Sequence, residues 1–295
     1  MNIKRLFLLV LFFSTQIYSF AANSALVGAW QYGDGAANAS GVVVFLNNGI
    51  YFHAEDTVES GVDFDGMERG DYTWDETTGE LDALAIVDTN GEEGLSESRF
   101  SNSFTATIAG DSLVINDDGE RFTLGRVFST TNPIVGGWQF GDGAGNNSGV
   151  AVLLDNGIFF IAEDTDENAF EFDGIERGTY TWDPSTGALG IPSIAVDTNG
   201  ENGASHPIGD FFFTIAGDQA VARDEEDSTS LSRVTFIAGS SSIAPVVDGK
   251  ITITFEGVLQ ESTTLFDWQD VDPQPVSPWE LTPGVSQRFF VPRGK

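Results

Sequence analysis

The 295-residue chain contains one segment of about 108 residues twice, and this repeat constrains the fold more than any other feature. The run Val27–Gly35, VGAWQYGDG, recurs at 135–143 as VGGWQFGDG. The shift between matching blocks is 108 at first, then 109 and later 107, so insertions and deletions fall between the blocks, as in surface turns. The sequence therefore predicts two sister modules, at 24–130 and 131–238.

Each module shows the period of two that is typical of half-buried strands. Ile50, Phe52 and Ala54, for example, alternate with a second set of side chains. Turn sequences such as Asn47-Asn48-Gly49 separate the apolar runs, as hairpin connections do. Each module is expected to contain about eight strands and no helix. An antiparallel meander of that size has two unpaired edge strands, and it pairs them most simply by closing into a barrel. The expected fold class is all-β, with two tandem eight-stranded up-and-down antiparallel barrels plus a small C-terminal β module.

A tryptophan near the start of each module is paired in sequence with an arginine near its end. Trp30 follows Gly-Ala and Arg126 lies in the predicted last strand, and Trp138 and Arg233 repeat them in the second module. The pattern resembles the signature of the calycin group, specifically bacterial lipocalin-like domains. The resemblance implies that the tryptophan closes one barrel end and the arginine lies across its ring. Such a stack contributes about 0.5 to 2 kcal/mol. The modules are shorter than a classical lipocalin, which leaves the size of the lumen open.

Both ends of the chain differ from the modules. Residues 1–21 combine a basic start, an apolar stretch and small residues before a cut, which predicts a secretory signal peptide. Residues 239–248 are predicted to be a linker, and residues 249–295 a small β module. The pattern Leu-Gln-x-Ser-x-x-Leu-x-x-Trp at 259–268 resembles a module found at the C-terminal ends of many secreted bacterial proteins. We expect a protein that is secreted, periplasmic or on the cell surface.

Charge and cysteine content exclude several classes of function. The chain has 45 Asp and Glu against 13 Lys and Arg, a net charge of −32, which disfavours binding to nucleic acid and to acidic membrane surfaces. No apolar run after the leader is long enough to span a membrane, so the mature chain is not expected to be an integral membrane protein. Cysteine is absent, which excludes thiol nucleophiles and disulfides. The expected partner is an unknown small molecule or an extracellular surface.

A polar turn recurs in both modules with Asp, Asn and Glu at alternate positions. Oxygen ligands spaced in this way can converge on Ca²⁺, which prefers six to eight oxygens. The same residues also suit a hairpin turn in which Asp and Asn bond to their own backbone, and this second interpretation is favoured. The candidate ligands are Asp88, Asn90, Glu92, Asp197, Asn199 and Glu201.

A second recurrent set gathers carboxylates and arginines near the loop between the third and fourth predicted strands. It can bind cations or polar sugars at a barrel mouth, or Arg69 can neutralise Glu55 or Glu68 in a structural pair. The structural pair is favoured. Carboxylates in pairs also suggest glycosidase chemistry, which needs two groups about 5 to 9 Å apart. The candidate mouth residues are Glu55, Asp56, Glu68, Arg69, Glu163, Asp164, Glu176 and Arg177.

The modules differ on one face of the third predicted strand, where Tyr51 aligns with Phe159 and His53 with Ile161. If this face lines the lumen, the two barrels are expected to hold different ligands. If it faces outward, both lumens are filled by side chains, which the Phe content favours. Neither histidine recurs in the sister module, and no Ser-His-Asp order appears, so an enzyme is not expected.

The sequence as a whole predicts a secreted, non-enzymatic binding or surface-interaction protein. One alternative is a Ca²⁺-stabilised extracellular structural or adhesive protein with solid lumens. A second alternative is a hydrolase that uses the mouth carboxylates.

Overall fold

The computed structural model describes residues 25 to 293 with gaps. The gaps in the two repeats are 37–38, 57–64, 92–93, 96–103, 118, 146, 166–172, 201–202 and 236–240. In the C-terminal segment the described residues are 241–247, 250–255, 258–262, 269–271, 275, 279–281 and 289–293. The predicted signal peptide lies outside the described residues.

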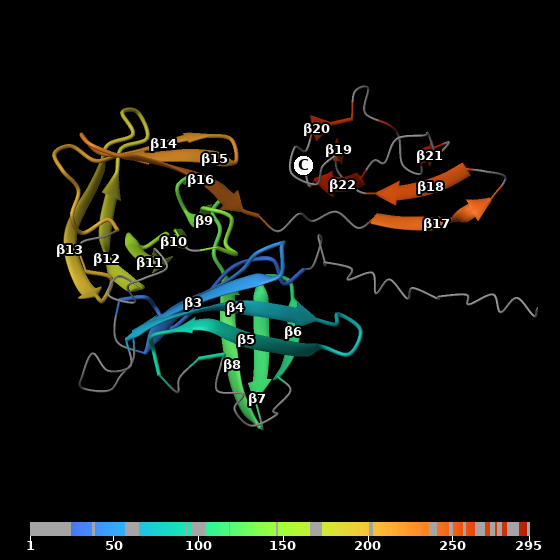
Figure 1. The fold of residues 1–295 in the computed structure, drawn as a ribbon, viewed down its shortest axis with the longest axis horizontal. Helices are drawn as coiled ribbons and strands as arrows, with labels where there is room; N and C mark the ends of the chain where they lie inside the picture. The colour runs from blue at the N-terminus through green and yellow to red at the C-terminus, as the bar shows by residue number, and fades with distance from the viewer. Residues whose placement is uncertain are drawn as a thin grey trace, which may run out of the picture.

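The first repeat is a closed antiparallel barrel of eight strands, in which each strand pairs with the next and β8 returns to β1 (Figure 1). Trp30 on β1 lies opposite Arg126 on β8 at the closing seam. The strands are β1 (Gly28–Tyr32), β2 (Ser40–Phe45), β3 (Ile50–Asp56), β4 (Gly66–Trp74), β5 (Glu80–Asp88), β6 (Phe104–Ala109), β7 (Ser112–Asp117) and β8 (Glu120–Arg126).

The second repeat has the same strand order in a single eight-stranded sheet, but it closes less completely. Its edge strands meet at one isolated bridge, Ala188–Phe212, beside a backbone bond of 2.8 Å from Leu189 N to Phe211 O. The strands are β9 (Gly136–Phe140), β10 (Ser148–Leu153), β11 (Ile158–Asp164), β12 (Gly174–Trp182), β13 (Leu189–Asp197), β14 (Phe212–Ala216), β15 (Gln219–Arg223) and β16 (Ser228–Val234). The predicted all-β class and tandem barrels are confirmed, with the second barrel half open.

The C-terminal segment forms two sheets of three strands each. The first sheet is β17 (Ser241–Val247), β18 (Lys250–Phe255) and β21 (Trp279–Leu281); the second is β20 (Gln269–Asp270), β19 (Val258–Ser262) and β22 (Phe289–Arg293). β17 falls within the predicted linker 239–248, because the branched residues after the serines favour a strand. Across the described parts of the chain, no helix has the length and hydropathy needed to cross a membrane.

Both predicted Trp–Arg stacks are present. The guanidinium carbon of Arg126 lies 3.9 Å from the ring centroid of Trp30, and that of Arg233 lies 4.0 Å from Trp138. Arg126 also donates to Val27 O at 2.9 Å, so the guanidinium ties the end of β8 to the entry of β1 as well as covering the indole. Each barrel is thereby sealed at one end.

The outer faces of β2–β4 and β10–β12 pack against each other and form one hydrophobic core shared by both repeats. Ile50, Phe52 and Ala54 lie in this shared core, whereas Tyr51 lies in the core of the first lumen. The face that differs between the repeats is therefore the lumen. The favoured expectation that it points outward is wrong, because the outward face is itself buried by the sister repeat.

Candidate functional site

The eight residues expected at a barrel mouth separate onto two faces of the sheets, since successive side chains of a strand point to opposite sides. One group lies between the repeats, namely Asp56, Arg69, Asp164 and Arg177. The other group bonds to lumen side chains or to segments across the barrel, namely Glu55, Glu68, Glu163 and Glu176. These residues were predicted to lie together because they are neighbours in sequence. Neighbouring residues of a strand point to opposite faces of the sheet, so the structure separates them.

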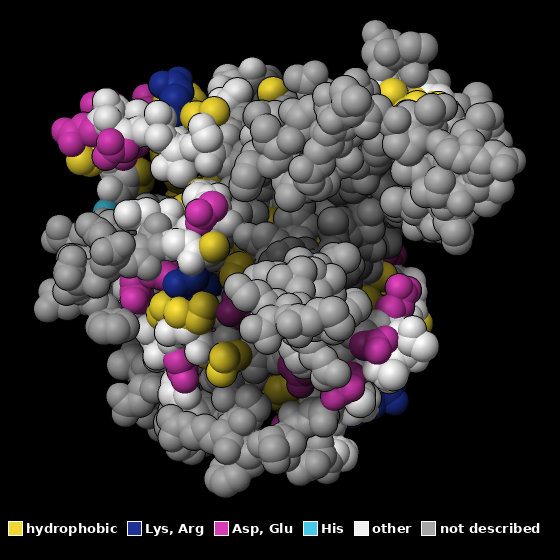
Figure 2. All heavy atoms as spheres, turned by 45° about the vertical axis from the view of Figure 1, so that its right-hand side comes forward, with side chains coloured by type: hydrophobic (Ala, Val, Ile, Leu, Met, Phe, Trp, Pro, Cys, Tyr) yellow, Lys and Arg dark blue, Asp and Glu magenta, His cyan; other side chains and the backbone are white. Residues whose placement is uncertain are grey.

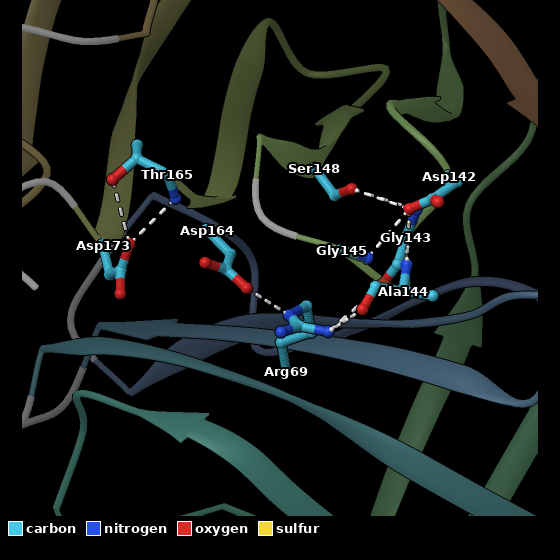
Figure 3. Close-up of polar contacts among 9 residues, drawn as sticks. All are labelled: Arg69, Asp142, Gly143, Ala144, Gly145, Ser148, Asp164, Thr165 and Asp173. Atoms are coloured by element: carbon cyan, nitrogen blue, oxygen red, sulfur yellow. Dashed lines mark hydrogen bonds and ion pairs between the residues drawn. The ribbon is translucent and has the colours of Figure 1, made fainter. Parts of the chain in front are cut away.

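The first group forms reciprocal bonds across the repeat interface. Arg69 donates from Nε to Asp164 and, at 3.0 Å, from Nη1 to Ala144 O (Figure 3). Its sister Arg177 pairs with Asp56 and donates to the backbone carbonyl of residue 35 at 3.0 Å. Both arginines and both aspartates are buried. The expected pairing of Arg69 with Glu55 or Glu68 is therefore wrong, and the contact is two-fold in character.

In the first lumen, Glu55 is surrounded by donors. Tyr32 donates its hydroxyl to Glu55 Oε2 at 2.6 Å and also lies 3.0 Å from His53 Nε2. Asn90 donates to the other carboxylate oxygen at 3.4 Å. Tyrosine, imidazole and amide thus occupy the space around this carboxylate.

The second lumen keeps the carboxylate and loses the tyrosine hydroxyl and the imidazole beside that hydroxyl. Phe140 stands in the position of Tyr32, and Ile161 in the position of His53. Glu163 retains only the amide of Asn199, at 3.3 Å, among the hydrogen bonds found within the described residues. Burial, assisted by the nearby carboxylates of Glu176 and Asp173, raises the pKa of Glu163 to about 7, although the hydrogen bond from Asn199 opposes this rise.

The other pair of lumen glutamates, Glu68 and Glu176, accepts hydrogen bonds from backbone N–H groups of loops. Glu68 accepts from the Tyr51 hydroxyl at 3.1 Å and from Leu95 N at 3.0 Å. Glu176 accepts from Ala204 N at 2.7 Å and from Ser205 N at 3.1 Å. Burial raises the pKa of Glu176, although these donors favour its ionised form. This role explains why the glutamate recurs in both modules.

A cavity of about 210 Å³ opens in the second lumen. Its wall is mostly aromatic and aliphatic and includes Phe140, Phe159, Ile161, Tyr180, Phe213 and Leu231, with Glu163 as a polar group. Four large residues buried in the first lumen, Val43, Leu95, Leu113 and Ile115, are replaced by Ala151, Ala204, Ala220 and Ala222. Three of these alanines, at 151, 204 and 222, line the cavity. Phe213 replaces Ala106 and fills part of the released volume beside Trp138.

The described segment 203–211 crosses the open end of this lumen and is held on both sides. Glu176 on β12 binds its first residues, and Asp224 accepts from Ile208 N at 2.9 Å on the opposite side. Arg223, Asp224 and Asp227 line the same end of the cavity. The guanidinium of Arg223 is itself stacked on Phe212, 4.5 Å from the ring centroid.

The predicted calcium ligands that the structure describes differ in their environments. Asn90 and Asn199 are fully buried and donate to the lumen glutamates, whereas Asp88 and Asp197 are exposed. Glu92 and Glu201 lie outside the described residues. Asp197 instead lies within 4.8 Å of Glu176 and His206, a grouping that the sequence did not suggest. The Ca²⁺ site stays a prediction, which a thermal melt with and without chelator tests.

Sequence reasoning missed the residues that shape the cavity. Ala204 and Ala222 are ordinary alanines in a single module, and Phe140 is one aromatic residue among many. The signal that identifies them is the comparison of inward-facing positions between the repeats, where large side chains are exchanged for small ones. That comparison needs the assignment of faces, which the structure supplies.

Comparisons with known proteins give no family for this chain. No family model and no curated protein matches it. Among solved structures, a DNA polymerase III beta-subunit sliding clamp from Pseudomonas aeruginosa is 7% identical, with a TM-score of 0.13, covering 90% of this chain and 78% of that chain. The Helicobacter pylori beta clamp is 11% identical, with a TM-score of 0.12, covering 92% and 79%. TM-scores this low support no argument about the fold or the function of this chain.

Proposed function

We propose that this chain is an extracytoplasmic, non-enzymatic binding protein built from two lipocalin-like barrels, in which the second lumen takes a small, largely apolar ligand. The observation that carries the proposal is the contrast between sister lumens, four large aliphatic side chains against four alanines. A cavity of 150 Å³ lined by apolar side chains holds benzene. The cavity of about 210 Å³ therefore has room for a ring with a short chain.

Energetics supports a ligand in this space. A bound apolar group covers wall surface that the open end of the lumen leaves accessible to water, and each Å² of apolar surface removed from water contributes about 25 cal/mol. The first lumen is instead filled by side chains such as Leu113 and Ile115, so the barrel fold itself does not demand the cavity.

The test returns the sister residue to the cavity wall. Ala222→Ile is expected to raise the melting temperature of the full chain and to reduce its affinity for 2-phenylethanol at least tenfold, measured by calorimetric titration, because the side chain fills the site. The control is Val221→Ile, which adds bulk on the same strand at an exposed position, and it leaves affinity unchanged. Equal binding by Ala222→Ile and the wild type contradicts the proposal.

A further inference from the structure

We infer that the ligand of the second lumen carries a cationic nitrogen that binds Glu163, replacing the hydroxyl and imidazole that surround the equivalent Glu55. The inference rests on the proposed function and adds the chemical class of the ligand: a small amine with an apolar body. The chain supplies its own comparison, since the same carboxylate sits in a closed lumen and in an open one.

The first step is the missing donors. Glu55 accepts hydrogen bonds from Tyr32 at 2.6 Å and from Asn90 at 3.4 Å, and His53 Nε2 lies 3.0 Å from the same tyrosine hydroxyl. At the position of Glu163 the duplication keeps the carboxylate and the asparagine, and it exchanges the other two groups for Phe140 and Ile161. A carboxylate accepts hydrogen bonds and donates none when ionised. In its ionised form Glu163 therefore favours a group that brings a donor.

The second step is the sign of the surroundings. Glu176 and Asp173 act on Glu163 electrostatically, and Asp224 and Asp227 line the open end of the same cavity. Arg223 is the cation among the described lining residues, and its guanidinium lies over Phe212. The chain carries a net charge of −32, and acidic side chains are scattered over the face shown in Figure 2. This field favours a cation over a neutral donor and opposes an anion.

The third step is the body of the ligand. The cavity wall beyond Glu163 consists of Phe159, Ile161, Phe213 and Leu231 together with the alanines at 151 and 222. An ammonium on a short chain places its charge on the carboxylate while its ring fills the apolar space. Pairing with a cation also compensates the desolvation of Glu163, which burial keeps partly protonated near neutral pH.

Three probes of similar size test the inference by calorimetric titration of the full chain: 2-phenylethylamine, 2-phenylethanol and phenylacetate. We expect the amine to bind at least tenfold more tightly than the alcohol at pH 8, and the carboxylate to bind most weakly. Affinity for the amine rises from pH 6 to pH 8 as Glu163 ionises, whereas affinity for the alcohol does not.

Two variants assign the effect to the carboxylate. Glu163→Gln is expected to reduce amine affinity tenfold or more and alcohol affinity less than threefold, since it removes a charge-assisted hydrogen bond and little volume. Phe140→Tyr restores the hydroxyl of the first lumen and is expected to lower amine affinity by competing for Glu163. Glu226→Gln removes an exposed charge beside the cavity and is the control, with affinities unchanged.

The outcomes separate the inference from the proposed function. If the alcohol binds and the amine binds no more tightly, or if Glu163→Gln leaves amine affinity unchanged, the amine inference is overturned and the lumen site stands. If the carboxylate probe binds most tightly, the sign of the ligand is wrong. If none of the three probes binds, both the inference and the lumen site fail.

Discussion

Replacing Arg69 with leucine is expected to destabilise the protein by about 3 to 5 kcal/mol, the usual cost of removing one partner of a buried ion pair. The structure explains the size of the effect. Arg69 is 3% exposed and Asp164 3%, so the substitution leaves a carboxylate in an apolar interface without its cation. It also removes the donor to Ala144 O at 3.0 Å. Burial already raises the pKa of Asp164, and the guanidinium is the group that opposes this.

The assay is urea unfolding followed by tryptophan fluorescence, with single and double variants arranged in a cycle. The double variant Arg69→Leu/Asp164→Leu is expected to recover at least half of the loss, because no unpaired charge remains in the interface. Arg121→Leu on the exposed side of β8 is the control and changes stability by less than about 0.5 kcal/mol. A loss below 1 kcal/mol for the single variant, or a double variant less stable than it, would refute the reasoning.

Two further predictions concern a lumen carboxyl and an interface glycine. The pKa of Glu163 in the folded protein, about 7, lies above its ordinary value of 4.5, so the stability of the wild type falls as pH rises between these values. Glu163→Gln lacks this titration and is expected to gain up to about 3 kcal/mol of stability relative to the wild type between pH 4.5 and pH 8, measured from the midpoints of urea unfolding. A variant whose advantage does not grow with pH contradicts this. Gly143→Ala should cost about 2 to 4 kcal/mol of stability, since its φ is +77° and a Cβ would lie 2.5 Å from Leu46 Cδ1. Gly110→Ala, at φ +61° with open space around it, is the control and should cost only about 1 kcal/mol in the same urea unfolding assay. Equal losses would show that the contact with Leu46 is not the cause.

The sequence was sufficient for the barrels and for their closed ends. Period-two alternation and turn chemistry are local, so strands such as β3 and β11 could be placed without knowing what they pack against. The Trp30–Arg126 stack was predictable because these residues, which recur in the second module, resemble the calycin signature, and that resemblance implies the stack. These features depend on each module alone.

The partners of Arg69 and Asp56 were not predictable in the same way. Alternation shows that a strand has two faces and does not say which face meets water, the lumen or another module. Phe52 and Tyr51 are both buried, one between the repeats and one in the lumen, and their sequence contexts are equivalent. Asn90 was misplaced for a similar reason, since a polar residue in a turn is usually solvated and this one points inward to Glu55.

The two-fold interface gives a physical reason for what the repeats share and where they differ. Each repeat carries both halves of the contact, the arginine and the aspartate, so any change on the outward face alters a packed, charged interface on both sides of the pseudo-two-fold axis. Accordingly Phe52 is matched by Phe160 and Arg69 by Arg177. Tyr51 and Phe159 lie instead in the separate cores of the two lumens, and these two matched residues differ. One lumen can therefore stay packed and stabilise the pair, while the other tolerates the loss of packing that a ligand site requires.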